Sequence, residues 1–363
     1  MLKELSIKNF RNLNIPLLKI PTGFTILVGN NGQGKTNLLE AIYFLSAGKS
    51  FRGMKKEVIN WASEEAIIEA DTSVGNIRII ISRNKETNIL INGKQKNILY
   101  LFGKLPTVIF YPEEINLVSG PPTLRRSWLD RLISTADKNY FYHLLNFYKA
   151  LKNKNALLKN NIKDNDHLEV WNKNLAFHGA KIWLNREKTL EKINQILKKI
   201  SKKVAGQVIF LQYKNPVKGC SEKEAQKRFL KNLFLQKEIE QRLKMTIFGP
   251  HRDDFEIIIE EETNQTIVQE DLSLFGSRAQ QRQAVISLKL VEEKYLTEVL
   301  AKPPLILLDD PFSELDTKNR ELLISNLNSP QVLLTATSTE FLPAIIKRKG
   351  YIVEIEKGEI KNV

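Results

Sequence analysis

The stretch that decides the fold is Gly29-Asn30-Asn31-Gly32-Gln33-Gly34-Lys35-Thr36, which matches the phosphate-loop pattern G-x-x-x-x-G-K-[ST] in full. Glycines let such a backbone curl so that successive N–H groups point at a polyphosphate. Lys35 supplies a charge for the β- and γ-phosphates, and the Thr36 hydroxyl can take one position on Mg²⁺. The stretch predicts a nucleotide-binding site. A solvated glycine-rich turn is the alternative interpretation.

The residues on both sides of this loop fit a nucleotide site. Phe24, Ile26 and Val28 alternate with Thr25 and Leu27, which predicts a strand that leads into the loop. Residues 37–46 are predicted to form a helix whose N-terminus lies at the bound anion. Strand, loop and helix therefore follow one another in the order that a phosphate loop needs.

A second segment near the C-terminus supplies the acidic groups that such a site requires. Leu305-Ile306-Leu307-Leu308 is an apolar run that ends in Asp309 and Asp310, as a buried parallel strand would. Asp309 is predicted to hold Mg²⁺, directly or through water, and Asp310 to polarise an attacking water as a base. The alternative is a buried strand that ends in a polar turn. Residues 332–337 are predicted to be a further central strand, and residues 351–356 an edge strand.

Composition limits the class of protein. The chain is 42% hydrophobic, which is ordinary for a globular protein, and its single cysteine, Cys220, excludes an intrachain disulfide. No apolar run approaches the roughly 18 residues that cross a bilayer. The four histidines are scattered and show no metal-ligand spacing. We expect a soluble, cytoplasmic protein without a membrane partner.

The net charge of +14 is located in one part of the chain. Residues 111–250 contain 27 Lys and Arg against 13 Asp and Glu, whereas the remainder holds 28 of each kind. A basic segment between neutral ones favours contact with nucleic acid. The alternative is general lysine enrichment with a solvated basic face, and the same choice applies to the run Lys198, Lys199, Lys202 and Lys203.

The basic middle of the chain is predicted to be mainly helical, and residues 222–243 are predicted to form one amphipathic helix. It is followed by Gly249-Pro250-His251-Arg252-Asp253-Asp254, a turn with four ionisable side chains before a predicted strand. No nucleophile or metal set accompanies this turn, so it is only a candidate polar site. Its residues can serve the nucleotide, the fold or communication between domains.

Four stretches together resemble the ABC-type ATPases of the SMC/Rad50 superfamily and, within it, the RecF family of bacterial recombination mediators. They are Ser6–Leu13 ahead of Gly29–Tyr43, then Gly249–Asp254, then Phe275-Gly276-Ser277-Arg278-Ala279-Gln280-Gln281-Arg282 in the place of the ABC signature, and Leu307–Asp316, a Walker B motif that runs into a D-loop. Their order and spacing match along nearly the whole chain, as does the lack of the coiled coil that the larger relatives insert.

The resemblance implies a set of site residues. Lys35 and Asp310 would be catalytic, and Thr36 and Asp309 would hold Mg²⁺. The implied ATP-binding residues are Gly29, Asn30, Asn31, Gly32, Gln33, Gly34, Lys35, Thr36, Asn37, Arg11, Ser277, Arg278 and Gln280. The signature residues of one subunit would close over the γ-phosphate of ATP bound to a second subunit.

Two positions depart from the family pattern. The signature usually has glycine where this chain has Ala279, and the added methyl group can weaken ATP-dependent pairing or hydrolysis unless a backbone shift absorbs it. Ser277 and the following helix N-terminus can still meet the phosphate. Asp310 stands where many ABC enzymes use glutamate, and its shorter arm would position a water less well. Slow turnover is expected.

The implied fold is an α/β, ABC-type P-loop ATPase head, a mixed sheet with helices, from residues 1–108 plus 246–363. A basic, mainly helical arm domain, 109–245, is inserted into it. The implied function is an ATP-dependent homodimer that clamps double-stranded DNA at single-strand gaps, works with RecR and RecO to load RecA, and is a weak DNA-stimulated ATPase. A nucleotide-gated DNA-binding module without turnover and an ABC transporter subunit are the other classes that we considered.

Lys35→Met is expected to abolish ATP binding and ATP-induced dimerisation, because it removes the charge that faces the phosphates. Equilibrium binding of labelled ATP and sedimentation with ATP and Mg²⁺ measure the two effects. Unimpaired dimerisation of this variant in ATP would rule out the assigned use of the phosphate loop.

Overall fold

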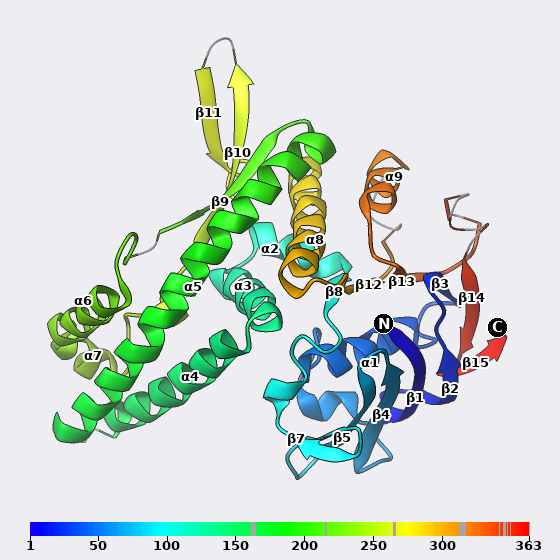
Figure 1. Ribbon diagram of the computed structural model, residues 1–363, viewed down its shortest axis with the longest axis horizontal. Helices are drawn as coiled ribbons and strands as arrows, with labels where there is room; N and C mark the ends of the chain where they lie inside the picture. The colour runs from blue at the N-terminus through cyan, green and yellow to red at the C-terminus, as the bar shows by residue number, and fades with distance from the viewer. Residues whose placement is uncertain are drawn as a thin grey trace. The chain divides into compact units, whose positions relative to one another are not determined.

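Two six-stranded sheets and a helix-rich segment make up the protein, whose computed structural model is drawn in Figure 1. The structure describes residues 1–160, 165–214, 216–263, 266–311, 317–340, 342–343, 346, 348 and 350–362. The chain divides into two units, which are Met1–Ile115 with Val285–Val363, and Asn116–Ala284. This is an α/β head fold with a helical insertion, as predicted.

The first unit contains a mixed sheet that carries the phosphate loop. Its strands run in the order β15-β14-β3-β13-β12-β8, and all neighbouring pairs are parallel except β14 with β15. Every residue of β12 and β13 is buried, which explains why both read as unbroken runs dominated by apolar residues. The strands are β3 (Gly23–Val28), β8 (Thr107–Phe110), β12 (Leu305–Leu308), β13 (Gln331–Ala336), β14 (Tyr351–Glu356) and β15 (Glu359–Asn362).

The strand predicted at residues 351–356 is β14, but the prediction that it forms the edge of the sheet is wrong. Strand β15 pairs with it on the outer side through Ile355↔Ile360 and Glu356↔Glu359. The turn between the two strands places Lys357 at a φ of 51° and Gly358 at 86°, a left-handed pair that reverses the chain tightly. The sheet therefore ends one strand later than the sequence predicts.

The second sheet of this unit is antiparallel, in the order β2-β1-β4-β5-β6-β7. Its β4 alternates buried and less buried residues, and the buried face packs with helix α1 (Lys35–Ala47) in one core. The strands are β1 (Leu2–Phe10), β2 (Leu13–Lys19), β4 (Glu65–Thr72), β5 (Gly75–Ser82), β6 (Asn88–Ile91) and β7 (Lys94–Lys96). This unit also contains helix α9 (Thr317–Asn326) and the short 3₁₀ helices η1 (Lys55–Val58), η2 (Ile98–Tyr100) and η3 (Pro112–Ile115).

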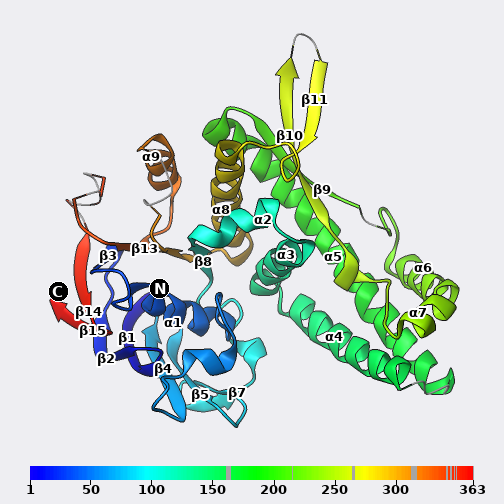
Figure 2. The ribbon, with the colours of Figure 1, turned by 180° about the vertical axis from the view of Figure 1, so that it is seen from behind.

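The second unit is built on two long helices, α4 (Lys138–Lys159) and α5 (Asn165–Ala205), which pack side by side (Figure 2). A three-stranded antiparallel sheet in the order β11-β10-β9 accompanies them. Its elements are α2 (Asn116–Ser119), α3 (Pro122–Ala136), α4 (Lys138–Lys159), α5 (Asn165–Ala205), β9 (Val208–Tyr213), α6 (Glu222–Leu235), α7 (Lys237–Leu243), η4 (Pro250–Arg252), β10 (Phe255–Thr263) and β11 (Thr266–Asp271). Helix α8 (Arg278–Leu300) begins in this unit and continues the chain into the first.

The single helix predicted at residues 222–243 is wrong, because the structure has two helices there. Helix α6 ends at Leu235 and is capped by Gln236, whose N–H donates to the carbonyl oxygens of Asn232 and Phe234. Helix α7 then starts anew and places Glu240 against Lys154, with 2.6 Å between Nζ and Oε2. Both side chains of this ion pair are 2% exposed, so the break lets a buried lysine meet its counter-charge.

A buried polar network holds the turn Gly249–Asp254 to the long helix α5. Arg186, which is 1% exposed, donates to Asp130, Asp253 and the carbonyl oxygen of Pro250 at 2.8–2.9 Å. The same Asp253 Oδ2 accepts hydrogen bonds from Trp183 Nε1 at 2.7 Å and from the Tyr213 hydroxyl at 2.5 Å. The turn therefore serves the fold of the second unit, which is one of the roles that the sequence left open.

Residues 246–284 pack with the second unit, whereas the division expected from the sequence groups them with the head. The physical reason lies in two sets of contacts. Strand β10 pairs with β9, for example through Ile257↔Leu211, and Arg125 binds Asp254 with both carboxylate oxygens at 2.8 Å. Among the described helices, none is long and apolar enough to cross a membrane.

Arg186→Leu is expected to lower the free energy of unfolding of the second unit by about 3–5 kcal/mol, because two buried carboxylates lose their partner. Urea unfolding followed by tryptophan fluorescence reports mainly on this unit, which holds Trp128, Trp171 and Trp183. The matched control is Lys173→Leu in the same unit, whose side chain is 65% exposed and lies 2.7 Å from Glu169. It should cost about 0–1 kcal/mol. Equal small losses in both variants would contradict the assigned role.

Candidate nucleotide-binding site

The site lies where parallel strands of the mixed sheet end. Strand β3 runs into the phosphate loop, β12 into Asp309 and Asp310, and β13 into Thr337. Because β3, β13 and β12 are parallel neighbours, their carboxyl ends meet at one edge of the sheet. Segments that are far apart in the sequence are thereby brought to the N-terminus of α1.

Two glycines are required by the local geometry of the loop. Gly34 caps helix α1 with a φ of 115°, a left-handed conformation that other residues rarely adopt. At Gly29, a Cβ atom would lie 2.3 Å from the carbonyl oxygen of Ile355 in β14. The loop backbone is also tied to the β14–β15 turn, since Gln33 Oε1 accepts from Lys357 N at 2.6 Å and Gln33 O from Gly358 N at 2.8 Å. The loop is therefore fixed on both sides.

A pocket of about 220 Å³ opens above the loop. It brings together most of the residues that the sequence assigns to nucleotide and metal. The lining residues are Asn31, Gly32, Gly34, Lys35, Thr36, Asn37, Arg52, Asp309, Asp310, Thr335 and Thr337. Among the predicted loop residues, Gly29, Asn30 and Gln33 do not line the pocket but hold Lys35 or the β14–β15 turn.

Lys35 closes the loop on itself. Its Nζ donates to the carbonyl oxygens of Gly29 at 2.6 Å and Asn30 at 2.9 Å, and the residue is only 8% exposed. Burial lowers the pKa of this ammonium group, and the nearby charges of Asp310 and Asp309 partly offset that effect. A bound polyphosphate would give the ammonium group a stronger acceptor than a neutral carbonyl oxygen.

Thr36 and Asp309 form the part of the pocket that suits Mg²⁺. The Thr36 hydroxyl donates to Asp309 Oδ1 at 2.8 Å, and the Thr335 hydroxyl donates to the same oxygen at 3.0 Å. Burial raises the pKa of Asp309, and the two hydrogen bonds oppose this rise. Hydroxyl and carboxylate oxygens are ligands that Mg²⁺ prefers, so these residues fit the ion. No cluster of three or more His, Cys, Asp or Glu side chains that could hold a metal occurs among the described residues.

Asp310 follows β12 at the carboxyl edge of the mixed sheet and has an unusual backbone conformation. Its φ is 44°, in the left-handed region, and its N–H donates to the Thr335 hydroxyl at 2.7 Å. A non-glycine residue in this region costs of order 1 kcal/mol. The conformation places Asp310 in the lining of the pocket beside Asp309. This position is compatible with the predicted role as a base.

Arg52 lines the pocket, whereas the predicted ligand Arg11 does not. Glu40 of α1 is fully buried. Both of its carboxylate oxygens accept hydrogen bonds from Arg11. The carboxylate also accepts from Arg52 Nη2 at 2.7 Å and from the Ser50 hydroxyl at 2.5 Å. Burial alone would raise the pKa of Glu40, but these hydrogen bonds outweigh it and leave the pKa below its usual value. Sequence reasoning missed Arg52, although it lies in a basic loop bounded by Gly48 and Gly53.

The predicted signature residues lie in the second unit, at the start of α8. Ser277 and Gln280 form a reciprocal cap, because Gln280 N donates to Ser277 Oγ at 3.3 Å and Ser277 N donates to Gln280 Oε1 at 2.9 Å. Arg278 and Ala279 are exposed in the first turn. Ala279 is not among the residues with positive φ, so its backbone conformation does not require glycine. Phe312–Asp316, which holds most of the predicted D-loop, lies outside the described residues.

Comparison with known proteins identifies the class first. The family of the RecF/RecN/SMC N terminal domain matches residues 1–359, and the chain belongs to this family. The head domain of an SMC protein, described in complex with the C-winged helix domain of ScpA, has the same fold at 14% identity, with a TM-score of 0.55 over the whole chain and 96% of the other.

Within this class the chain is a member of the RecF family. It is 36% identical over 351 residues to the DNA replication and repair protein RecF of Thermoanaerobacter pseudethanolicus, covering 94% of this chain and 95% of that one. The RecF protein of Clostridium botulinum strain 657 is 33% identical over the full length of both. A structure described as the recombination mediator protein RecF with ATP in the RecFOR pathway is 33% identical and has a TM-score of 0.88, covering 100% of this chain and 97% of the other.

Asp309→Asn is expected to raise the midpoint of thermal unfolding at pH 7 in the absence of nucleotide. Burial raises the pKa of Asp309 in the folded state, so ionisation of this carboxyl lowers stability above that pKa. Asparagine keeps an acceptor for Thr36 and Thr335 without the charge. The gain should shrink as the pH falls through the folded pKa towards the unfolded value of roughly 3.9.

Scanning calorimetry from pH 4 to 8 measures this effect, and the exposed Asp71→Asn in β4 is the control. The stabilisation that ATP with Mg²⁺ gives the parent protein should be lost in Asp309→Asn. A lower unfolding midpoint of this variant at pH 7, or full retention of the nucleotide effect, would contradict the assignment.

Proposed function

We propose that this protein is an ATP-dependent DNA-binding protein of DNA replication and recombinational repair. The observation that carries the proposal is the hydrogen bond from Thr36 to Asp309 beside the buried Lys35, at the parallel edge of the sheet. This arrangement suits a triphosphate with its metal ion. Support also comes from RecF relatives that align with nearly the whole chain, including structures described with ATP and with an ATP analogue.

In this proposal ATP binds in the pocket above the loop. The backbone N–H groups of the loop and the Lys35 ammonium face the phosphates, and the Arg52 guanidinium adds a second positive charge. Mg²⁺ held by Thr36 and Asp309 would neutralise part of the charge that develops on the phosphates. Among the predicted ligands, Arg11 acts indirectly, because its contacts fix Glu40, which in turn holds Arg52.

The proposed active form is an ATP-dependent homodimer. Ser277, Arg278 and Gln280 of one copy would close over ATP bound to the other, so that the dimer has contacts to ATP that the monomer lacks. The support is that Ser277 and Gln280 cap α8 and that its first turn is exposed, since a helix N-terminus at the surface suits an anion. Ala279 adds a methyl group to this face. The backbone conformation of Ala279 does not require glycine, because its φ is not positive.

Duplex DNA with a single-strand gap is the proposed nucleic-acid partner. The whole net charge of +14 lies within residues 111–250, which belong almost entirely to the second unit. Exposed lysines at the end of α5, such as Lys199 and Lys203, extend this positive surface. By analogy with its family, the dimer would hold such DNA with RecR and RecO and promote loading of RecA. Binding should weaken steeply with salt, since it rests on phosphate contacts.

Weak, DNA-stimulated hydrolysis of ATP to ADP and phosphate would reset the dimer. Asp310 would act as the base that orients the attacking water, and it lines the same pocket as Lys35. A nucleotide-gated module without turnover is the second candidate function. The specific observation in its favour is the shorter carboxylate of Asp310 where related ATPases use glutamate, together with Ala279 in the signature.

Asp310→Asn is expected to keep ATP binding and to lower phosphate release at least about a hundredfold, because a general base contributes roughly 10²–10⁴ in rate. Release is measured with and without gapped duplex, and binding with labelled ATP. The ATP-bound dimer of this variant should persist longer than that of the parent protein. Phosphate release by the parent that is undetectable in both conditions would favour the module without turnover.

A further inference from the structure

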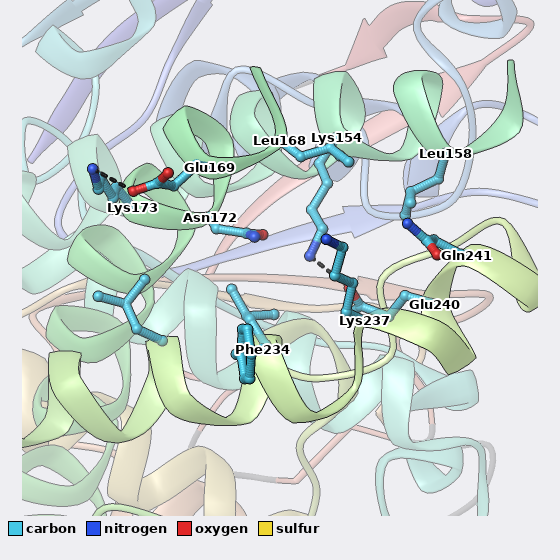
Figure 3. Close-up of a pocket in the computed structure, with 12 residues that line it drawn as sticks. Lys154, Leu158, Leu168, Glu169, Asn172, Lys173, Phe234, Lys237, Glu240 and Gln241 are labelled. Atoms are coloured by element: carbon cyan, nitrogen blue, oxygen red, sulfur yellow. Dashed lines mark hydrogen bonds and ion pairs between the residues drawn. The ribbon is translucent and has the colours of Figure 1, made fainter. Parts of the chain in front are cut away.

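Glu261 of β10 is a half-buried carboxylate whose partners are amide side chains instead of cations. By contrast, in the pocket drawn in Figure 3, Glu240 pairs with Lys154 and Glu169 with Lys173. In the part of the chain that the structure describes, Glu261 forms no ion pair, and its Oε1 accepts hydrogen bonds from two amide groups. Such a carboxylate orients its donors, because a hydrogen bond to a charged acceptor is roughly twice as strong as one between neutral groups.

The two amide groups come from segments that lie far apart in the sequence. Gln207 Nε2 donates to Glu261 Oε1 at 2.7 Å, and Gln280 Nε2 donates to the same oxygen at 3.0 Å. Gln207 lies two residues after the end of α5, and Gln280 lies in the first turn of α8, within the predicted signature. Glu261 therefore joins the end of the long helix to the signature.

The side chain of Gln280 is held at both of its polar atoms. Its Nε2 is bound by Glu261, and its Oε1 accepts a hydrogen bond from Ser277 N at 2.9 Å. Ser277 and Gln280 are the two residues of this turn that both cap α8 and are proposed to meet the ATP of a second copy. A glutamine side chain without such partners samples several rotamers and has to be ordered when it meets a ligand. Glu261 supplies this order in advance.

The turn that precedes the signature is fixed independently of this contact. Gln281, which is 6% exposed, donates from Nε2 to the carbonyl oxygens of Leu272 at 3.1 Å and Gly276 at 3.2 Å. A Cβ atom at Gly276 would lie 2.6 Å from the carbonyl oxygen of Leu272, so this turn requires glycine. The main chain is therefore set without Glu261, and loss of the carboxylate should act on the side chain that it holds.

The carboxylate itself stands on a well-anchored part of the second unit. Strand β10 pairs with β9, and β9 is bound to the last turns of α5. Asn194 exchanges two hydrogen bonds with the backbone of Leu211, at 2.7 Å and 2.8 Å, and the Ser201 hydroxyl accepts from Ile209 N at 2.9 Å. A side chain can position another only when its own base is fixed, and Glu261 meets this condition.

We propose that Glu261 is a positioning residue of the ATP-dependent dimer. It holds the Gln280 amide so that the signature of one copy is ordered before it meets the nucleotide of the other, and Gln207 holds the carboxylate in turn. The inference rests on the proposed function, because Gln280 is an ATP ligand only in the pair of copies. Pre-ordering of this kind strengthens association by removing the entropy cost of fixing a side chain.

The test is the dimer Kd of the full-length protein, from sedimentation velocity over a range of concentrations with ATP and Mg²⁺. Glu261→Ala should raise this Kd about tenfold or more, because ordering a freed side chain costs roughly 2- to 12-fold per contact and a symmetric dimer contains two such contacts. Glu261→Gln should raise it about threefold, since it keeps an acceptor without the charge. Binding of labelled ATP to the monomer should change less than about twofold in both variants, because the phosphate loop is untouched.

The matched control is Glu260→Ala on the same strand. Glu260 is also half-buried and accepts from a glutamine amide, Gln269 Nε2 at 3.0 Å, but it does not contact α8. This variant should leave the dimer Kd unchanged. A double-mutant cycle then shows whether Glu261 acts through Gln280. In a Gln280→Ala background, Glu261→Ala should have almost no further effect, which corresponds to a coupling of about fivefold or more.

The possible results separate this inference from the function on which it rests. A parent protein that stays monomeric in ATP overturns both. A parent protein that dimerises, with Glu261→Ala pairing as tightly or more tightly, overturns only the role of Glu261, and so does full additivity with Gln280→Ala. Should Glu261→Ala fail to fold, as its unfolding midpoint reports, the isosteric Glu261→Gln is compared with Glu260→Gln, and equal dimer Kd values of these two variants overturn the inference.

Discussion

The hydrogen bond between Thr36 and Asp309 joins two residues that are 273 positions apart in the sequence, and the candidate nucleotide site depends on it. It forms because β12 lies next to β13, and β13 next to β3, all parallel. The chain between these strands includes the whole second unit. The inserted second unit is therefore compatible with the site, because strands from both ends of the chain pair in the one sheet of the first unit.

Several features of the site lower the stability of the folded protein. Asp309 is buried with a raised pKa, Lys35 is buried with a lowered pKa, and Asp310 has a positive φ. Each of these features reduces stability in the absence of a ligand. Their concentration within one small pocket is the pattern expected of a functional site, where a bound polyphosphate and its metal ion would offset the same costs.

Much of this site could be predicted from local sequence. The phosphate loop and the run Leu305–Leu308 have patterns that the backbone dictates, and the strands and helix formed as expected. Arg52 could not be found in this way, because it reaches the pocket only through Asn37 and the buried Glu40. Arg11 is brought close to the same carboxylate, and no local pattern distinguishes a residue that lines the pocket from one that supports it.

The turn Gly249–Asp254 illustrates the other limit of sequence reasoning. Its partners Arg186 and Arg125 lie 67 and 129 positions away from Asp253 and Asp254, so its structural role became visible only in the folded chain. The same holds for the buried ion pair between Lys154 and Glu240, which α7 forms after the break at Gln236. Long-range ion pairs leave no periodic signal in the sequence.

The central claim is that ATP bound at the phosphate loop joins two copies of this chain on DNA. Sedimentation velocity with ATP and Mg²⁺, with ADP, and without nucleotide, each with and without gapped duplex, tests it most directly. The account predicts that the protein is a dimer with ATP and a monomer with ADP or without nucleotide. It also predicts that the dimer binds DNA more tightly than the monomer does. A monomer in every condition would contradict it, because the signature face of α8 would then not meet the nucleotide of a second copy.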